Sequence, residues 1–148
     1  AGDHEFTGYQ ARFSTSPQRV LSGGAAFNWG DFYNGERTGF TSSVTLAPGY
    51  HLILNAGWDR NDIVLPGGSF ITDLVRTRAS YVFSPRTVLH AFVQYNTDTN
   101  QVASNIRFNW TYRPLSDIYV VYNDTRLTPS GLTRERALIV KVTRLISF

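Results

Sequence analysis

Four titratable side chains could perform acid–base chemistry: His51, Asp59, Asp62 and His90. A catalytic base must lie within hydrogen-bond reach of a nucleophile or a water molecule. The histidines fall near one end of their segments and the aspartates near the other. At about 3.3 Å per strand residue, we expect the two pairs to be too far apart to act together.

Other catalytic patterns are missing from the sequence. It has no nucleophile elbow, no glycine-rich phosphate loop, no His-x-x-x-His pair and no cysteine. The sequence therefore predicts a non-enzymatic protein without a metal or another cofactor. An enzyme that acts on lipid or peptide is the alternative.

A second group of polar residues recurs at alternate positions, as expected for one face of a sheet. Its main members are Arg12, Arg76, Arg78, His90, Arg107, Asn109 and Lys141, accompanied by His51, Asp59, Gln94 and Asn96. These side chains could line a cationic interior that favours anionic solutes, or fill a small barrel as a salt-bridge and hydrogen-bond network. The basic residues are scattered and the net charge is only +3, which argues against nucleic-acid binding.

Short alternating segments, separated by turn residues, must position these groups, and they predict an all-β domain without helices of note. We expect strands at 5–14, 19–33, 37–47, 50–65, 69–83, 87–97, 102–113, 117–127 and 134–148. The whole chain, 1–148, reads as one domain, in which 1–16 is either a partial strand or an N-terminal extension. Two turn classes alternate between the strands: proline turns, such as "SPR", and loops rich in Gly, Asn and Asp. This alternation predicts an up-and-down antiparallel meander.

The length of the strands and the placement of aromatic residues favour a membrane. Several predicted strands exceed ten residues, and a strand tilted across a bilayer needs about nine to eleven. Aromatic side chains gather near both ends of the apolar face, as they do at the two interfaces of a bilayer. We therefore expect a transmembrane β-barrel of about 8 to 10 strands, apolar outside and polar inside. A soluble, lipocalin-like barrel that binds a ligand is a second alternative.

The last predicted strand alternates up to the final residue, with Val140, Val142, Ile146 and Phe148 on one face. We expect this strand to close the barrel, because closure removes an exposed sheet edge. The ending resembles the assembly signal of bacterial outer-membrane barrels, although Arg144 stands where such signals usually carry an aromatic residue.

A more specific resemblance covers residues 14–148, most clearly 69–126. The segments "GSFITDLVRTRASYVFSPRTVLHAFVQYN", "SNIRFNWTYRPLSDIYVVYNDTR" and "ALIVKVTRLISF" resemble the barrel of a bacterial family. In that family a periplasmic, carbohydrate-binding-like DOMON-type domain precedes an outer-membrane barrel of unassigned function.

The resemblance implies a bacterial outer-membrane location, with the lipid bilayer, lipopolysaccharide and the barrel assembly machinery as partners. The family barrel has more strands than this chain can supply, so the resemblance is to its C-terminal part. For this chain we expect the role of a passive pore or a membrane anchor.

Overall fold

The computed structural model describes residues 7–145, and they form nine strands and no helix. The strands are β1 (Gly8–Ser14), β2 (Leu21–Phe32), β3 (Gly35–Leu46), β4 (Leu52–Leu65), β5 (Gly68–Ser84), β6 (Thr87–Asn96), β7 (Gln101–Arg113), β8 (Ser116–Leu127) and β9 (Thr133–Val142). All nine coincide with the predicted segments to within a few residues, apart from the end of the last.

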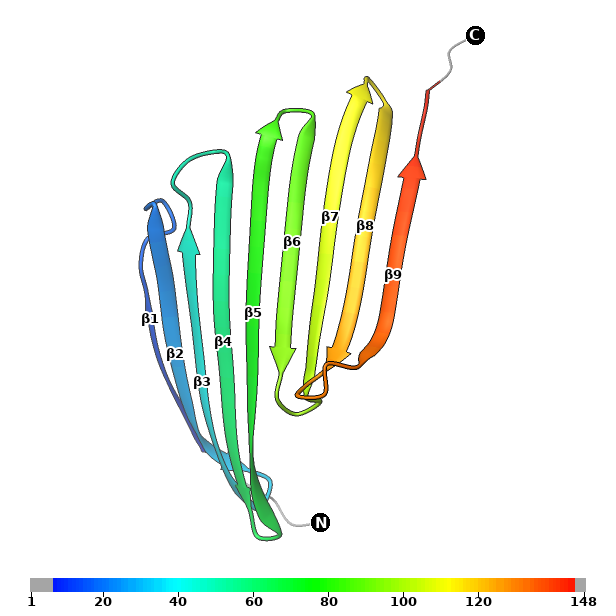
Figure 1. Cartoon of the computed structure of the whole chain (residues 1–148). Helices are drawn as coiled ribbons and strands as arrows, with labels where there is room; N and C mark the ends of the chain where they lie inside the picture. The colour runs from blue at the N-terminus through cyan, green and yellow to red at the C-terminus, as the bar shows by residue number, and fades with distance from the viewer. Residues whose placement is uncertain (1–6, 146–148) are drawn as a thin grey trace.

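The strands lie side by side in chain order, each antiparallel to the next, in a single sheet (Figure 1). The predicted all-β, up-and-down fold is therefore confirmed. The connections also fall into the two predicted classes. The predicted proline turns, at 15–20, 47–51, 85–86 and 114–115, all lie at one end of the sheet, and the loops, such as 97–100 and 128–132, lie at the other. We call these the turn end and the loop end.

The sheet has two free edges in the part of the chain that the structure describes. There β1 pairs only with β2 and β9 only with β8, so the predicted closure of the barrel by the last strand is not confirmed. Because successive strands alternate in direction, β1 and β9 both run from the loop end to the turn end. They are therefore parallel to each other.

The last strand is shorter than predicted. β9 ends at Val142, whereas the alternating pattern predicts a strand up to Phe148. Thr143 still exchanges backbone hydrogen bonds with Asp117, at 3.1 and 2.8 Å, because this pair extends the antiparallel ladder past the end of β9. β8 begins at Ser116, so little of its backbone is left to pair with the residues that follow. Ile146 and Phe148 lie outside the described residues.

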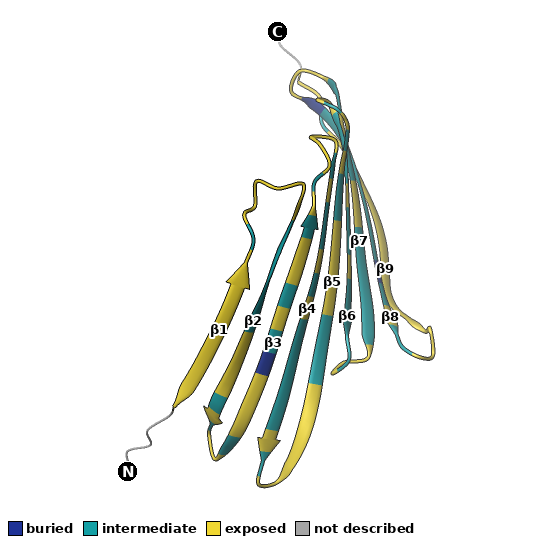
Figure 2. Cartoon of the chain, turned by 90° about the vertical axis from the view of Figure 1, so that its left-hand side faces the viewer, coloured by how far each residue is buried: buried dark blue, intermediate teal, exposed yellow. Residues whose placement is uncertain are grey.

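The register divides the sheet into two faces. The side that carries Ile106, Phe108 and Trp110 is the apolar face, and the side that carries Arg107 and Asn109 is the polar face. Five hollows are lined mainly by residues of the polar face, so this face is the concave one. The sheet as a whole is curved and twisted, and nearly all of its surface is exposed or half-buried (Figure 2).

Candidate functional site

The apolar face has no cover. Hydrophobic residues make up 42% of the sequence, yet none of those in the described part of the chain is buried. Trp29, Val75, Phe83, Trp110 and Leu138 are each at least two-fifths exposed. Soluble domains bury such side chains, and contiguous apolar patches as large as a whole sheet face mark an interaction surface. Something other than these residues must therefore cover the apolar face.

The apolar side chains form a belt that ends sharply on the loop side. On β2 the belt runs from Leu21 to Trp29, and the next residue on this face is Asp31. On β5 it runs from Phe83 back to Val75, and Asp73 follows. These stretches are about as long as the nine to eleven residues with which a tilted strand crosses a bilayer.

The margin of the belt on the loop side crosses the strands obliquely. Paired residues form rows at right angles to the strands, and one row joins Ala25, Ser42, Trp58, Val75, Tyr95, Val102 and Arg126. On β2 the last apolar residue, Trp29, lies four residues beyond this row toward the loops. On β8 the last apolar residue before the charges, Tyr122, lies four residues short of it. The margin thus shifts by about eight residues between these two strands.

This shift corresponds to a strand tilt. Eight residues at about 3.3 Å each give about 26 Å, and the six strand spacings from β2 to β8 give about 29 Å at about 4.8 Å each. If the margin of the belt runs parallel to the plane of a bilayer, the strands are inclined by about 43° to the normal of that plane. Strands of closed transmembrane barrels are tilted by about 35–45°.

Aromatic rings gather at both margins of the belt. On the loop side, Tyr9 stacks on Trp29 with ring centroids 5.5 Å apart. On the turn side, Tyr81 and Phe83 contact each other at 4.6 Å, and Trp110 and Tyr112 at 6.2 Å. This arrangement matches the two predicted aromatic zones.

The polar face collects part of the predicted basic set. Arg76, Arg78, His90 and Arg107 lie on three adjacent strands, β5 to β7. Arg76 forms an ion pair with Asp59. The Arg78 guanidinium lies 5.5 Å from the centre of the Phe92 ring. Arg78, His90 and Arg107 line one hollow of about 450 Å³, so these three side chains border a single open space.

The other predicted members of this set lie on the same face but elsewhere. Arg12, on β1, lines a separate hollow of about 230 Å³. Asn109 and Lys141 both pair with Tyr119, nearer the turn end. The Oδ1 atom of Asn109 is buried and has no hydrogen-bond partner among the described residues. The seven residues therefore line one face without forming one site.

The candidate acid–base residues do not converge. His51, just before β4, donates from Nδ1 to the carbonyl oxygen of Val82 at 2.7 Å, and Asp59 lies eight residues further on, within β4, or about 26 Å away. His90 pairs with Ser80, with 2.9 Å between Nδ1 and Oγ. Asp62 pairs with Thr38 on the apolar face and so points away from the others. Among residues 7–145, no three His, Asp or Glu side chains gather as metal ligands would.

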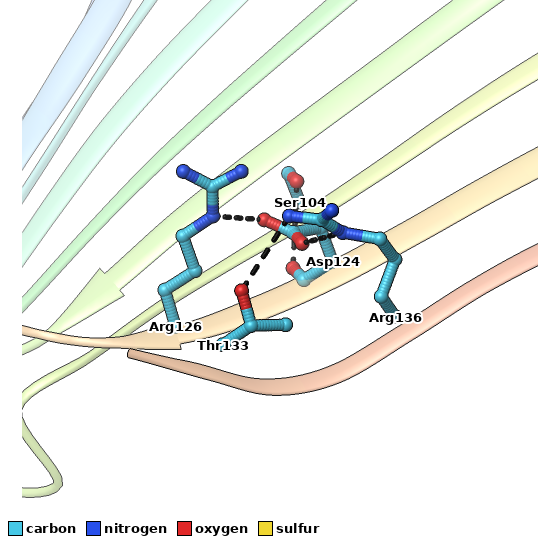
Figure 3. A network of polar contacts seen from close by, with 5 residues as sticks. All are labelled: Ser104, Asp124, Arg126, Thr133 and Arg136. Carbon is cyan, nitrogen blue, oxygen red and sulfur yellow. Dashed lines mark hydrogen bonds and ion pairs between the residues drawn. The ribbon is translucent and has the colours of Figure 1, made fainter. Parts of the chain in front are cut away.

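A charged cluster on the loop side of the belt escaped the sequence analysis. Asp124 lies on the apolar face of β8, two residues beyond Tyr122, and its carboxylate joins Arg126 and Arg136 (Figure 3). Asp124 is only 6% exposed. Continuing the alternation of β8 past Tyr122 would have placed Asp124 and Arg126 on this face, but the pairing with Arg136 depends on the register with β9.

Two of the four residues predicted to form an assembly signal are described. Val140 and Val142 lie on the apolar face of β9 and are 59% and 62% exposed. The other two, Ile146 and Phe148, fall outside residues 7–145. The exposed valines continue the belt to the edge of the sheet.

Comparison with known proteins gives no further lead, because neither the family models nor the curated proteins include a match to this chain. Within residues 7–145 no helix is long and apolar enough to cross a membrane.

Proposed function

We propose that the chain forms the wall of a bacterial outer-membrane β-barrel, with its apolar face against lipid acyl chains and its polar face toward an aqueous interior. The observation that carries this proposal is the belt of exposed apolar side chains without any buried hydrophobic core in the described residues. Lipid is the cover that fits it, because the belt has aromatic rings at both margins and its inclination agrees with the tilt of barrel strands.

A soluble, lipocalin-like barrel fits less well. In such a barrel the apolar face points inward, so the hollow side of the sheet would carry the hydrophobic residues. Here the hollows are lined by Arg78, His90, Arg107 and other polar residues, while the hydrophobic residues occupy the opposite face. This orientation supports a polar interior and an apolar exterior.

Closure of the barrel by an antiparallel pair requires strands in addition to the nine described. β1 and β9 run in the same direction, so an antiparallel ladder between them needs an odd number of further strands. A barrel larger than nine strands agrees with the resemblance to the C-terminal part of a longer barrel. Closure would also remove both free edges, each of which otherwise exposes unpaired backbone groups.

The role that this arrangement supports is passive and non-enzymatic. The candidate histidines are separated from the candidate aspartates by about 20 Å or more along the strands, since the row of His90 crosses β4 at Ile53, six residues from Asp59. Neither Arg78 nor Arg107 forms an ion pair within residues 7–145. An open interior would therefore be a pore that favours small anions, and a filled one would make the barrel a membrane anchor.

Labelling of two adjacent positions on β7 tests the orientation of the sheet. Phe108→Cys places a thiol on the apolar face, and Asn109→Cys places one on the polar face at nearly the same depth. In assembled protein, a reagent dissolved in the lipid phase should label the first variant, and a small aqueous reagent should label the second. The opposite pattern would contradict the proposal. Planar-bilayer conductance of the assembled protein then separates a pore from an anchor.

A further inference from the structure

The cluster of Asp124, Arg126 and Arg136 lies where the belt ends on β8 and β9. On the apolar face, Tyr122 and Leu138 form the last apolar pair, and Asp124 and Arg136 form the next pair toward the loops. If the belt lies among acyl chains, as proposed above, this next pair is at the level of the lipid headgroups.

The contacts within the cluster hold both guanidinium groups in place (Figure 3). The Nε atoms of Arg126 and Arg136 donate to the two carboxylate oxygens of Asp124, at 2.5 and 2.9 Å. Arg136 also donates from Nη2 to Thr133 Oγ1 at 3.4 Å. The buried carboxylate thus fixes the positions of two side chains that would otherwise move freely, and an anchored guanidinium loses less entropy when it binds a ligand.

The cluster has a positive charge and hydrogen-bond donors left over with which it could bind an anion. Two arginines face one aspartate, so the cluster has a net charge of +1. The two arginine side chains remain 47% and 51% exposed, whereas the Asp124 side chain is 7% exposed. The Nη atoms of Arg126 have no hydrogen-bond partner among the described residues and remain available as donors. Paired guanidinium groups with free Nη donors are a common way of binding phosphate.

The rest of this margin has the opposite charge. On β2 to β5 the same side of the belt carries Asp31, Glu36, Asp62 and Asp73, with Arg60 as a basic residue. Arg60 is paired with Asp73 at 3.6 Å. An anionic headgroup would be repelled there and attracted at β8 and β9.

We infer that Arg126 and Arg136 bind the phosphate group of an anionic membrane lipid at this margin. The inference rests on the proposed membrane location and adds to it a specific site and a ligand class. The alternatives are a soluble phosphate compound as the ligand and a purely intramolecular role, in which the arginines only fasten β8 to β9.

The experiment uses the assembled protein in phosphatidylcholine vesicles that contain a minor fraction of spin-labelled lipid, either phosphatidic acid or phosphatidylcholine. Electron paramagnetic resonance gives the association of each labelled lipid with the protein. One net charge near the membrane surface is worth about 1 kcal/mol, so we expect about fivefold preference for phosphatidic acid.

The test variant replaces Arg126 and Arg136 with Gln and also carries Asp124→Asn, because the aspartate would otherwise be buried without a partner. The preference of this variant for phosphatidic acid over phosphatidylcholine should fall to about that of a neutral surface. The matched control is Arg60→Gln, which removes an arginine from the same margin where an acid already pairs with it. This control should keep the full preference.

Three results would overturn the inference: equal preference in the test variant and the wild type, loss of preference in Arg60→Gln, or full competition by inorganic phosphate in the buffer. Quenching of the native tryptophans by brominated lipid, measured in the same samples, separates the two levels of the proposal. If the tryptophans are quenched but phosphatidic acid is not preferred, only the lipid site is rejected. If brominated lipid does not quench the tryptophans, the membrane location itself is rejected.

Discussion

An arginine placed at the centre of the belt should be far more costly than one placed beside it on the other face. Ala79 lies midway along the belt on β5, four residues from Val75 and four from Phe83. Four residues correspond to about 13 Å along the strand, or about 10 Å along the normal after correction for the tilt. Its paired neighbours, Leu54 and Ala91, offer no counter-charge.

An arginine near the bilayer midplane of a β-barrel costs about 2–4 kcal/mol. We therefore expect Ala79→Arg to lower the free energy of unfolding by this amount, a change of roughly 30-fold to 900-fold in the unfolding equilibrium. Ser80→Arg, one residue further on and on the polar face, should cost less than about 1 kcal/mol because its guanidinium would lie in an aqueous interior. Tryptophan fluorescence during denaturant unfolding from lipid vesicles measures both values.

A third variant distinguishes a bilayer from a protein cover. Leu138 lies in the same row of paired residues as Ala79, but the inclination of the belt places it at the headgroup margin. Leu138→Arg should therefore cost only about 0–1 kcal/mol. Equal losses for Ala79→Arg and Leu138→Arg would refute the inclined belt, and a greater loss for Ser80→Arg than for Ala79→Arg would refute the assignment of the faces.

Three further outcomes are expected. Protease added to intact cells should cleave the loop at 128–132 before any connection at the turn end, because this polar loop is the longest connection at the loop end and we expect that end to be external; cleavage first at the turn end would invert the topology. Deleting Phe148 should lower the folded outer-membrane population in cells more than it lowers stability after refolding in detergent, as heat-modifiable gel mobility would show; equal, small losses would mean an ordinary chain end. Gly35→Ala should cost roughly 1–3 kcal/mol in denaturant unfolding and Gly49→Ala almost nothing, since an added Cβ would overlap the Val64 carbonyl oxygen in the first case and have no atom within 4 Å in the second; similar losses would contradict this packing.

The strands and their faces could be predicted because the controlling information is local. Alternation in "NIRFNWTYR" assigns Phe108 and Arg107 to opposite faces, and the proline of "SPR" ends β5. The same local pattern could not give the end of β9. The alternating pattern that includes Val140 and Val142 runs on along the sequence, but β9 ends where β8 has few backbone groups left to pair with it.

The inclination of the belt and the charged cluster depend on the register between strands. The tilt emerges only when Trp29 and Tyr122 are referred to one row of paired residues across the sheet. Likewise, Asp124 and Arg136 are twelve residues apart and meet only through the pairing of β8 with β9. Inspection of one strand at a time cannot supply either relation. It also could not reveal that Arg12 lies on a different part of the polar face from Arg107.

The contact between the apolar face and lipid can be measured without any substitution. All three tryptophans, Trp29, Trp58 and Trp110, lie on the apolar face: the first two near its loop-side margin and the third near its turn-side margin. In vesicles of brominated phosphatidylcholine, we expect strong quenching of their fluorescence, greater when the bromine atoms are close to the headgroup than when they are deep in the chains. Quenching by an aqueous quencher such as acrylamide, with none by brominated lipid at either depth, would show that lipid does not cover this face and would contradict the membrane assignment.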